Sequence, residues 1–277
     1  MNGKTKKTIS SVLFQVFCIM VGLVIICPIL YAFFISFMPS NQILRRPPTF
    51  IPETWILDNY KMALTLTTLG RFMLNSLIIA GISSVVRIIT ASMAAFAFSF
   101  FRFKGKDVIF MLFMGTIMIP SDIVLVTNYQ TTASLGLINT YLGMMLIFLV
   151  SATNVFMMRQ YFLTFSVSLK EAAAVDGCGN LRFFLQILLP LSTPVITTIF
   201  ISSFIGTWNT YLWPMLVTND NAMRTVQVGV TMLNFPDGTV YGPIMAASIL
   251  VLLPTLLIFV LFQKKIVGGI MGGAVKG

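Results

Sequence analysis

Histidine is absent from this chain of 277 residues, and aspartate and glutamate together number only eight. The lack of histidine excludes histidine general bases, histidine metal ligands and histidine proton relays. The eight carboxylates are scattered one or two to a segment, so no close pair is evident for acid and base catalysis. We therefore predict that the chain is not an enzyme.

Cysteine is also scarce. Cys18 and Cys27 fall within a long apolar run, and Cys178 stands alone in a more polar segment. This spacing matches neither a metal site nor a redox pair. A complete phosphate-binding loop is missing as well, since Gly3-Lys4-Thr5 matches only the end of that motif. We predict no metal and no cofactor on this chain, so energy from a nucleotide would have to come from another subunit.

Charge is sparse and apolar residues are abundant. Charged residues make up 9% of the chain and hydrophobic residues 57%, with a mean hydropathy of +0.93. A soluble domain of this size cannot bury that much apolar surface, so the composition predicts an all-α membrane protein. Runs of sufficient length predict six transmembrane helices, at residues 12–37, 72–101, 108–127, 140–158, 187–208 and 243–262.

The net charge of +10 does not gather into one patch of the kind that binds nucleic acid. Its distribution predicts the orientation of the spans instead. With the N-terminus inside, twelve of the eighteen basic residues fall in cytoplasmic segments and five in outer segments, and Arg87 lies within the second span. This asymmetry favours an arrangement with both termini inside.

The charged side chain of Arg87 is energetically unfavourable near the middle of a span unless it is paired or faces water. One interpretation is a structural ion pair, with Asp122 as the expected partner. The other is that Arg87 lines a translocation path and contacts a hydroxyl-rich or anionic solute. Trp208, Tyr211 and Trp213, at the predicted outer end of the fifth span, are likewise open to two readings: an interfacial aromatic belt, or a wall on which a sugar packs.

The segment from Ser168 to Pro190 is polar and lies between two apolar runs. Ser168 and Glu171 have the spacing of a capping box, which predicts the start of a short helix. Gly177 or Gly179 would end that helix, and Asn180 would cap a second one that runs from Leu181 toward Pro190. Pro190 and Pro194 should then kink or break the helix that follows. Taken alone, the segment could be an ordinary connector between membrane helices.

The order Glu171-Ala172-Ala173, then Gly177, then Ile187, Leu189 and Pro190 resembles the EAA loop of ABC importer permeases. Further matches cover nearly the whole chain: Asn75-Ser76-Leu77, Arg102-Phe103, Met118-Ile119-Pro120 and the run Gly272 to Gly277. The chain is similar to carbohydrate-type permeases, such as the shorter permease subunit of the maltose system. The resemblance implies a type I ABC importer permease fold in a prokaryotic inner membrane.

The resemblance also implies partners and the residues that meet them. The partners are a second permease subunit, two copies of an ATPase that uses ATP and Mg²⁺, and an extracytoplasmic solute-binding protein. The loop at about 166–190 would couple this chain to the ATPase, through the residues Glu171, Ala172, Ala173, Asp176 and Gly177. A C-terminal tail at 264–277 would reach the ATPase pair through Gly273, Val275 and Lys276. The binding protein would dock on Thr218, Asn219, Asp220 and Asn221, and the solute-path candidates are Arg87, Asp122, Trp208 and Tyr211.

Two alternatives stay open. A secondary transporter or channel that works alone would usually show inverted repeats or acidic residues within the membrane, and we find neither in the sequence. An ABC permease for a solute other than a sugar, such as glycerol phosphate, would show the same EAA loop. The sequence does not identify the solute.

Overall fold

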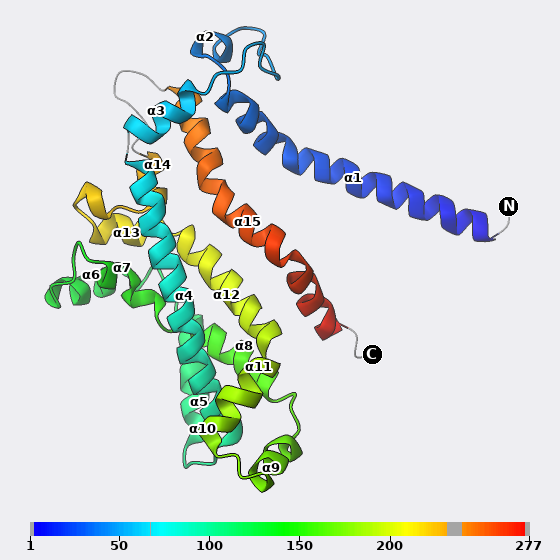
Figure 1. The fold of residues 1–277 in the computed structure, drawn as a ribbon, viewed down its shortest axis with the longest axis vertical. Helices are drawn as coiled ribbons and strands as arrows, with labels where there is room; N and C mark the ends of the chain where they lie inside the picture. The colour runs from blue at the N-terminus through cyan, green and yellow to red at the C-terminus, as the bar shows by residue number, and fades with distance from the viewer. Residues whose placement is uncertain (1–2, 67, 232–239, 275–277) are drawn as a thin grey trace. The chain divides into compact units, whose positions relative to one another are not determined.

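The computed structural model describes residues 3–66, 68–231 and 240–274 (Figure 1). All regular structure in these ranges is helical. Three helices are long and apolar enough to cross a membrane: α1 (Gly3–Ser36), α4 (Leu69–Phe100) and α15 (Tyr241–Ala274), whose candidate spans are Ser11–Ser36, Leu69–Phe100 and Tyr241–Gln263. They correspond to the first, second and sixth predicted spans.

Two more candidates are bent pairs of helices. Tyr141–Phe148 and Ala152–Phe162 meet at 51°, and Asn180–Leu191 and Thr193–Trp208 meet at 75°. They correspond to the fourth and fifth predicted spans, and the second bend lies between Pro190 and Pro194 as the sequence predicted. The described residues therefore hold three candidate spans, or up to five if each bent pair crosses once.

The predicted third span, 108–127, is not one continuous helix. α5 (Lys106–Gly115) passes into a short 3-10 turn, η1 (Thr116–Met118), and α6 (Leu125–Ser134) begins only after a gap. Ile119 is extended, with φ −83° and ψ 115°. The physical reason is Pro120, which disfavours helical geometry in the residue before it and has no N–H to donate.

The chain divides into two compact units. One comprises residues 1–69 and 230–253, and the other comprises residues 70–229 and 254–277. The first unit contains α1, the start of α15, and the short helices α2 (Ser40–Ile43) and α3 (Asp58–Leu66). α3 forms after Pro52, the last proline of the segment that joins α1 to α4.

Asn59 in α3 holds the end of α1. Its Nδ2 donates hydrogen bonds to the carbonyls of Ser36 at 3.0 Å and Met38 at 2.8 Å, and the Tyr60 hydroxyl lies 2.8 Å from Ser36 Oγ. The last carbonyls of a helix lack partners within it, so these side chains satisfy groups that would otherwise be unpaired. Gly242 lies against the Asn59 side chain with no room for a Cβ.

The second unit contains nearly all of α4, the elements α5, η1 and α6, and α15 from Pro254 onward. It also contains α7 (Tyr141–Met145), η2 (Leu146–Phe148), α8 (Ala152–Phe162), α9 (Val167–Val175), α10 (Asn180–Arg182), the π-helical η3 (Phe183–Leu188), α11 (Leu189–Leu191), α12 (Thr193–Trp208), α13 (Leu212–Val217), η4 (Asn221–Met223) and most of α14 (Val226–Thr231). Within this unit α9 lies near the end of α4, and α13 and α14 lie nearer its start (Figure 1).

Two hydrophobic clusters stabilise the second unit. The first joins α4, α8, α9, η3 and α12 around Phe96, Phe162, Phe183, Leu188 and Ile199. The second joins α4, α7 and α13 around Ile79, Met144 and Trp213. Because α4 contributes to both clusters, it links the two regions in which the candidate functional residues lie.

Candidate functional site

The polar helix α9 begins two residues earlier than the capping box predicts. Its N-cap is Ser166 and its first residue is Val167, so Ser168 is already inside the first turn. The Ser168 hydroxyl lies 2.8 Å from that of Ser166, and the N-cap side chain makes no capping hydrogen bond. The predicted capping box is therefore wrong, because Ser168 and Glu171 do not occupy the N-cap and N3 positions that the motif requires.

Gly177 ends α9, and it is one of the two glycines that were predicted to do so. Its φ of +76° lies in the left-handed region. The Gly177 N–H donates to the carbonyl of Ala174 at 3.0 Å, and the Cys178 N–H donates to that of Ala173 at 2.8 Å. This pair of bonds is a Schellman motif, which satisfies the last carbonyls of the helix.

The helix after the turn is not capped by Asn180. Gly179 occupies the N-cap position in an extended conformation, and Asn180 is the first helical residue, with no side-chain capping bond. The predicted second helix does run toward Pro190, as α10, η3 and α11 in succession. Its π-helical part spans six residues, an uncommon geometry that is frequent at functional sites.

The two faces of α9 differ sharply. Ala173 is buried at 6% exposure in the cluster that contains Phe162 and Phe183. Glu171, Ala172 and Asp176 are exposed. The small side chain of Ala173 thus permits close approach to this chain's own core, and only Ala172 of the two expected alanines lies on the open face.

Val175 is a residue of the open face that the sequence reasoning missed. Its side chain is 88% exposed, although it is apolar and lies beside Asp176 and the Gly177 turn. Val167, at the other end of α9, is 69% exposed. These two apolar side chains therefore lie on the open surface of α9. The sequence feature that could have indicated this residue is a valine between the three alanines and the turn at Gly177.

Lys170 ties α9 to α4. Its ammonium group donates to the carbonyl of Phe100, the last residue of α4, at 3.3 Å. The same group lies 5.0 Å from the ring centre of Phe101 and 5.8 Å from that of Phe100. A cation is stabilised at the C-terminal end of a helix and over aromatic faces. Lys170 therefore joins α9 directly to the end of α4.

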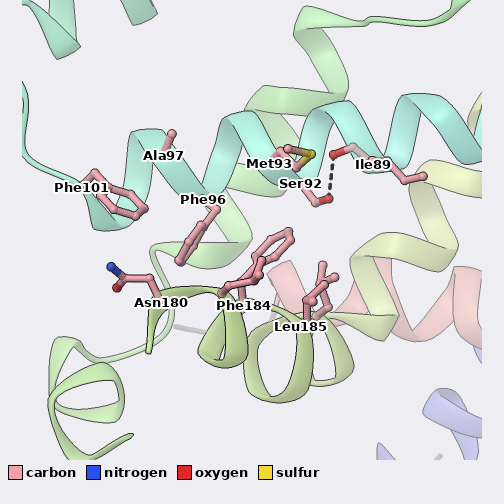
Figure 2. A pocket seen from close by; sticks show the side chains of 11 residues that line it. Ile89, Ser92, Met93, Phe96, Ala97, Phe101, Asn180, Phe184 and Leu185 are labelled. Atoms are coloured by element: carbon pink, nitrogen blue, oxygen red, sulfur yellow. Dashed lines mark hydrogen bonds between the residues drawn. The ribbon is translucent and has the colours of Figure 1, made fainter. Parts of the chain in front are cut away.

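An apolar cavity lies between α4 and the helix that follows the turn (Figure 2). Its volume is about 650 Å³, and its lining includes Ile89, Met93, Phe96, Phe184 and Leu185. The rings of Phe96 and Phe184 pack with centroids 4.9 Å apart. This lining offers almost no hydrogen-bonding groups, so it suits helix packing rather than a hydroxyl-rich solute.

Near the start of α4, polar side chains hold the segment between α13 and α14. Asn75 Nδ2 donates to the carbonyls of Ala222 and Arg224, each at 2.9 Å, and the Tyr141 hydroxyl donates to Asn75 Oδ1 at 2.6 Å. Ser76 Oγ accepts from the Val226 N–H at 2.9 Å. The Asn75-Ser76 motif therefore anchors this loop to the span.

The four residues predicted to dock a binding protein do not share one role. Thr218 is buried at 4% exposure and donates to the Pro214 carbonyl at 2.6 Å, so its side chain faces inward. Asn219, Asp220 and Asn221 are exposed. Asn139 Oδ1 accepts from the backbone N–H groups of Asn219 at 2.6 Å and Asp220 at 3.1 Å. The exposed trio is thus presented on a fixed backbone.

The predicted ion pair between Arg87 and Asp122 is not formed. Arg87 Nε donates to the carbonyl of Phe148 at 2.7 Å, and Thr90 Oγ1 donates to that of Leu149 at 3.0 Å. These carbonyls lie at the break between η2 and α8, where helical donors are missing. In a membrane such groups must find partners within the protein. The geometry gives Arg87 a structural role at that break.

Trp208 and Trp213 do not form an interfacial belt, because each is only 1% exposed. Trp208 stacks on Phe204 with ring centres 5.9 Å apart, and Trp213 Nε1 donates to the Met144 carbonyl at 3.1 Å. Tyr211 is half-buried and lines a second cavity together with Asp122. Two of the four solute-path candidates are thereby brought together, and Trp208 lies in the core.

The predicted C-terminal tail is helical as far as the structure describes it. α15 continues through Gly273 to Ala274, without a break after the predicted sixth span. Val275 and Lys276 lie outside the described residues. Among the residues that the structure describes, no group of three or more cysteine, aspartate or glutamate side chains could hold a metal ion.

Several apolar spans and a polar helix joined to one of them are features of a multi-pass membrane protein. The chain belongs to the family of binding-protein-dependent transport system inner membrane components, whose family model matches residues 84–270. It is a multi-pass permease subunit of an ABC importer in the inner membrane. The resemblance seen in the sequence is confirmed.

Similar proteins support the same assignment. The chain is 36% identical over 275 residues to the sn-glycerol-3-phosphate transport system permease protein UgpE of Rhizobium meliloti (strain 1021), covering 96% of this chain and 98% of that protein. It is 37% identical over 263 residues to UgpE of Brucella abortus (strain 2308), covering 91% and 93%. Both relatives are transport permeases rather than enzymes.

A solved structure shares the fold. It is the crystal structure of a bacterial ABC transporter involved in the import of the acidic polysaccharide alginate, with a TM-score of 0.86 and 21% sequence identity. The match covers 95% of this chain and 98% of the other. The arrangement of helices in this chain is therefore that of an ABC importer permease.

Proposed function

We propose that this chain is one half of a heterodimeric permease that imports a sugar or a related hydroxylated solute, with α9 seated in a cleft of an ATPase subunit. A second permease, two ATPase copies and an extracytoplasmic solute-binding protein complete the assembly. The observation that carries this proposal is the construction of α9, which has one face packed in the core of this chain and the other open to a partner.

The geometry explains how ATPase motion would enter the membrane. α9 contacts α4 through Lys170, and Ala173 fixes α9 to the same cluster as α8 and α12. A rigid helix held in a moving cleft would therefore move several spans together, which favours either an inward-open or an outward-open state. Open side chains such as Ala172 and Val175 would make the contact with the ATPase.

The two ends of α4 lie next to the two surfaces that we assign to the ATPase and to the solute-binding protein. Its 32 residues extend about 48 Å at 1.5 Å per residue, enough to cross a membrane. Lys170 binds the C-terminal end, whereas Asn75 and Ser76 near the other end anchor the loop that presents Asn219, Asp220 and Asn221. We place the ATPase at the α9 end and the binding protein at the loop end.

The membrane arrangement we propose has six crossings with both termini inside. The distribution of basic residues puts α9 and the ends of the chain on the cytoplasmic side. The third crossing would be built from α5, η1 and the chain around Pro120 rather than from one helix. The tail residues Gly273, Val275 and Lys276 would then meet the ATPase pair. ATP and Mg²⁺ would bind to the ATPase subunits.

The solute assignment follows from the relatives. The permeases of Rhizobium and Brucella are named for sn-glycerol 3-phosphate, and the structural neighbour is involved in the import of alginate. Both solutes carry hydroxyl groups together with an acidic group, so we assign a hydroxylated solute to this chain. A secondary transporter that works alone is the alternative. Purification of the chain with an ATPase and a second permease would support the importer, and transport by the pure single chain would support the alternative.

The experiment that tests ATPase coupling is substitution of Val175. We expect Val175→Asp to reduce ATP-driven uptake at least tenfold and to weaken copurification of the ATPase, because a charge would enter an apolar contact. The 88% exposure of this side chain predicts little change in the folding of the permease itself.

Val175→Ile is the matched control, since it keeps the residue apolar at the same position and should preserve uptake. Both variants should reach the membrane at the level of the unmodified chain. Equal uptake by the aspartate and isoleucine variants at equal expression would contradict the coupling role of α9.

A further inference from the structure

The second cavity of this chain is lined mainly by apolar side chains with a few polar groups, as small-molecule sites usually are. It has a volume of about 490 Å³ and combines Asp122, Asn128 and Tyr211 with the aromatic side chains of Phe148 and Trp213. Hydroxyl and amide groups exchange hydrogen bonds with a hydroxylated solute, and aromatic rings pack on its C–H face. The volume lies in the range of small-molecule sites.

The walls of this cavity are fixed by the surrounding fold. Trp213 is buried at 1% exposure, and its Nε1 donates to the Met144 carbonyl at 3.1 Å. Phe148 packs against the same hydrophobic cluster, and its carbonyl accepts from Arg87 Nε at 2.7 Å. Asn128 stands on α6, which packs on α13. The aromatic walls are therefore preformed and need little reordering to receive a solute.

The charge of the lining has one sign. Among the described residues that line the cavity, Asp122 is the only carboxylic acid, and none is lysine or arginine. The Arg87 guanidinium is engaged by the Phe148 carbonyl and lies 5.7 Å from the ring centre of Phe148. A carboxylate accepts hydrogen bonds from hydroxyl groups and repels anions.

We propose that this cavity binds an uncharged, hydroxyl-bearing portion of the transported solute, with Asp122 accepting its hydroxyl hydrogen bonds and excluding anionic groups. This inference rests on the proposed import function. It adds that a phosphate or carboxylate of the solute would be held outside this cavity, away from Asp122. Asp122 is then a residue that determines specificity.

The test measures the charge of the cavity directly in membranes that contain the complete transporter. Asn128→Cys is introduced after Cys18, Cys27 and Cys178 have been replaced by serine, and the thiol is labelled with a cationic and an anionic methanethiosulfonate reagent. We expect the ratio of cationic to anionic labelling rates to fall about fivefold when Asp122→Asn is added, because a nearby unit charge is removed.

Thr131→Cys is the matched control, because Thr131 is exposed on the same helix and lies outside the lining. Its labelling ratio should change little with Asp122→Asn. In a second arm, glycerol should slow the labelling of Asn128→Cys at a lower concentration than sn-glycerol 3-phosphate does. Asp122→Asn should reduce the difference between these two protecting concentrations.

An Asn128→Cys labelling ratio that is insensitive to Asp122→Asn would overturn the proposal, and so would stronger protection by the phosphate ester than by glycerol. Neither measurement requires ATP hydrolysis. Failure of the import function would appear instead as a lack of ATP-driven uptake by the unmodified assembly, so the two failures can be told apart.

Discussion

Gly177 is the single residue on which the shape of the coupling turn depends most. Its φ of +76° is costly for any residue with a Cβ, whereas open space surrounds the position. We expect Gly177→Ala to destabilise the turn by about 1 to 2 kcal/mol. The α9 helix would then sit less firmly in its partner, and ATP-driven uptake should fall while the level of folded permease in the membrane stays the same.

Gly179→Ala is the control for this prediction. Gly179 also has open space around it, but its φ is −70°, which any residue can adopt. Uptake should therefore be preserved in this variant. If both alanine variants lost uptake equally, flexibility of the loop rather than the left-handed conformation of Gly177 would be the cause.

Single residues also show where sequence reasoning succeeds. The end of α9 at Gly177 was predictable because a left-handed position depends on local geometry. The partner of Arg87 was not predictable, because it is the carbonyl of Phe148, which becomes available only where η2 and α8 separate. A carboxylate can be counted in the sequence, but an unpaired backbone carbonyl appears only once the breaks between helices are known.

At the scale of elements, the joint between α9 and α4 is the contact that should transmit motion. Lys170→Met removes the ammonium group that binds the Phe100 carbonyl and the neighbouring rings, and keeps most of the side-chain volume. We expect a loss of about 1 to 2 kcal/mol at this joint, since the hydrogen bond carries a charge and is half-buried. ATPase activity should continue with a reduced yield of transported solute per ATP.

Lys106→Met provides the comparison, because Lys106 donates to the neighbouring Phe101 carbonyl at 3.2 Å but belongs to α5. It should leave the ratio of solute to ATP nearly unchanged. The measurement is that ratio in proteoliposomes, and equal ratios for the two methionine variants would argue against α9 acting through Lys170.

Some elements were predicted correctly from the sequence, and others were not. Long apolar runs gave the positions of α1, α4 and most of α15 correctly, because hydropathy and length alone decide them. The run at 108–127 failed because Pro120 interrupts a segment whose composition still suits a membrane. The short helices α13 and α14 were not predicted from the sequence, since each spans only six residues.

At the scale of the whole molecule, the sites that we propose lie at three places in one unit: the open face of α9, the anchored loop at Asn219 to Asn221, and the cavity at Asp122. The EAA spacing predicts the first and its partner, because small residues and glycine at fixed positions are typical of that contact, and this stays a prediction. The cavity could not be predicted in the same way. Asp122, Asn128 and Tyr211 are brought together only by the packing of α6 against α13.

The most direct test of the central claim is a crosslink from the open face of α9 in the assembled transporter. With Val175→Cys in a chain whose own cysteines are serine, a thiol-specific photo-crosslinker should give an adduct with the ATPase subunit. The same reagent on Asn219→Cys, at the other end of α4, should give an adduct with the solute-binding protein. An ATPase adduct from Asn219→Cys, with none from Val175→Cys, would contradict the account.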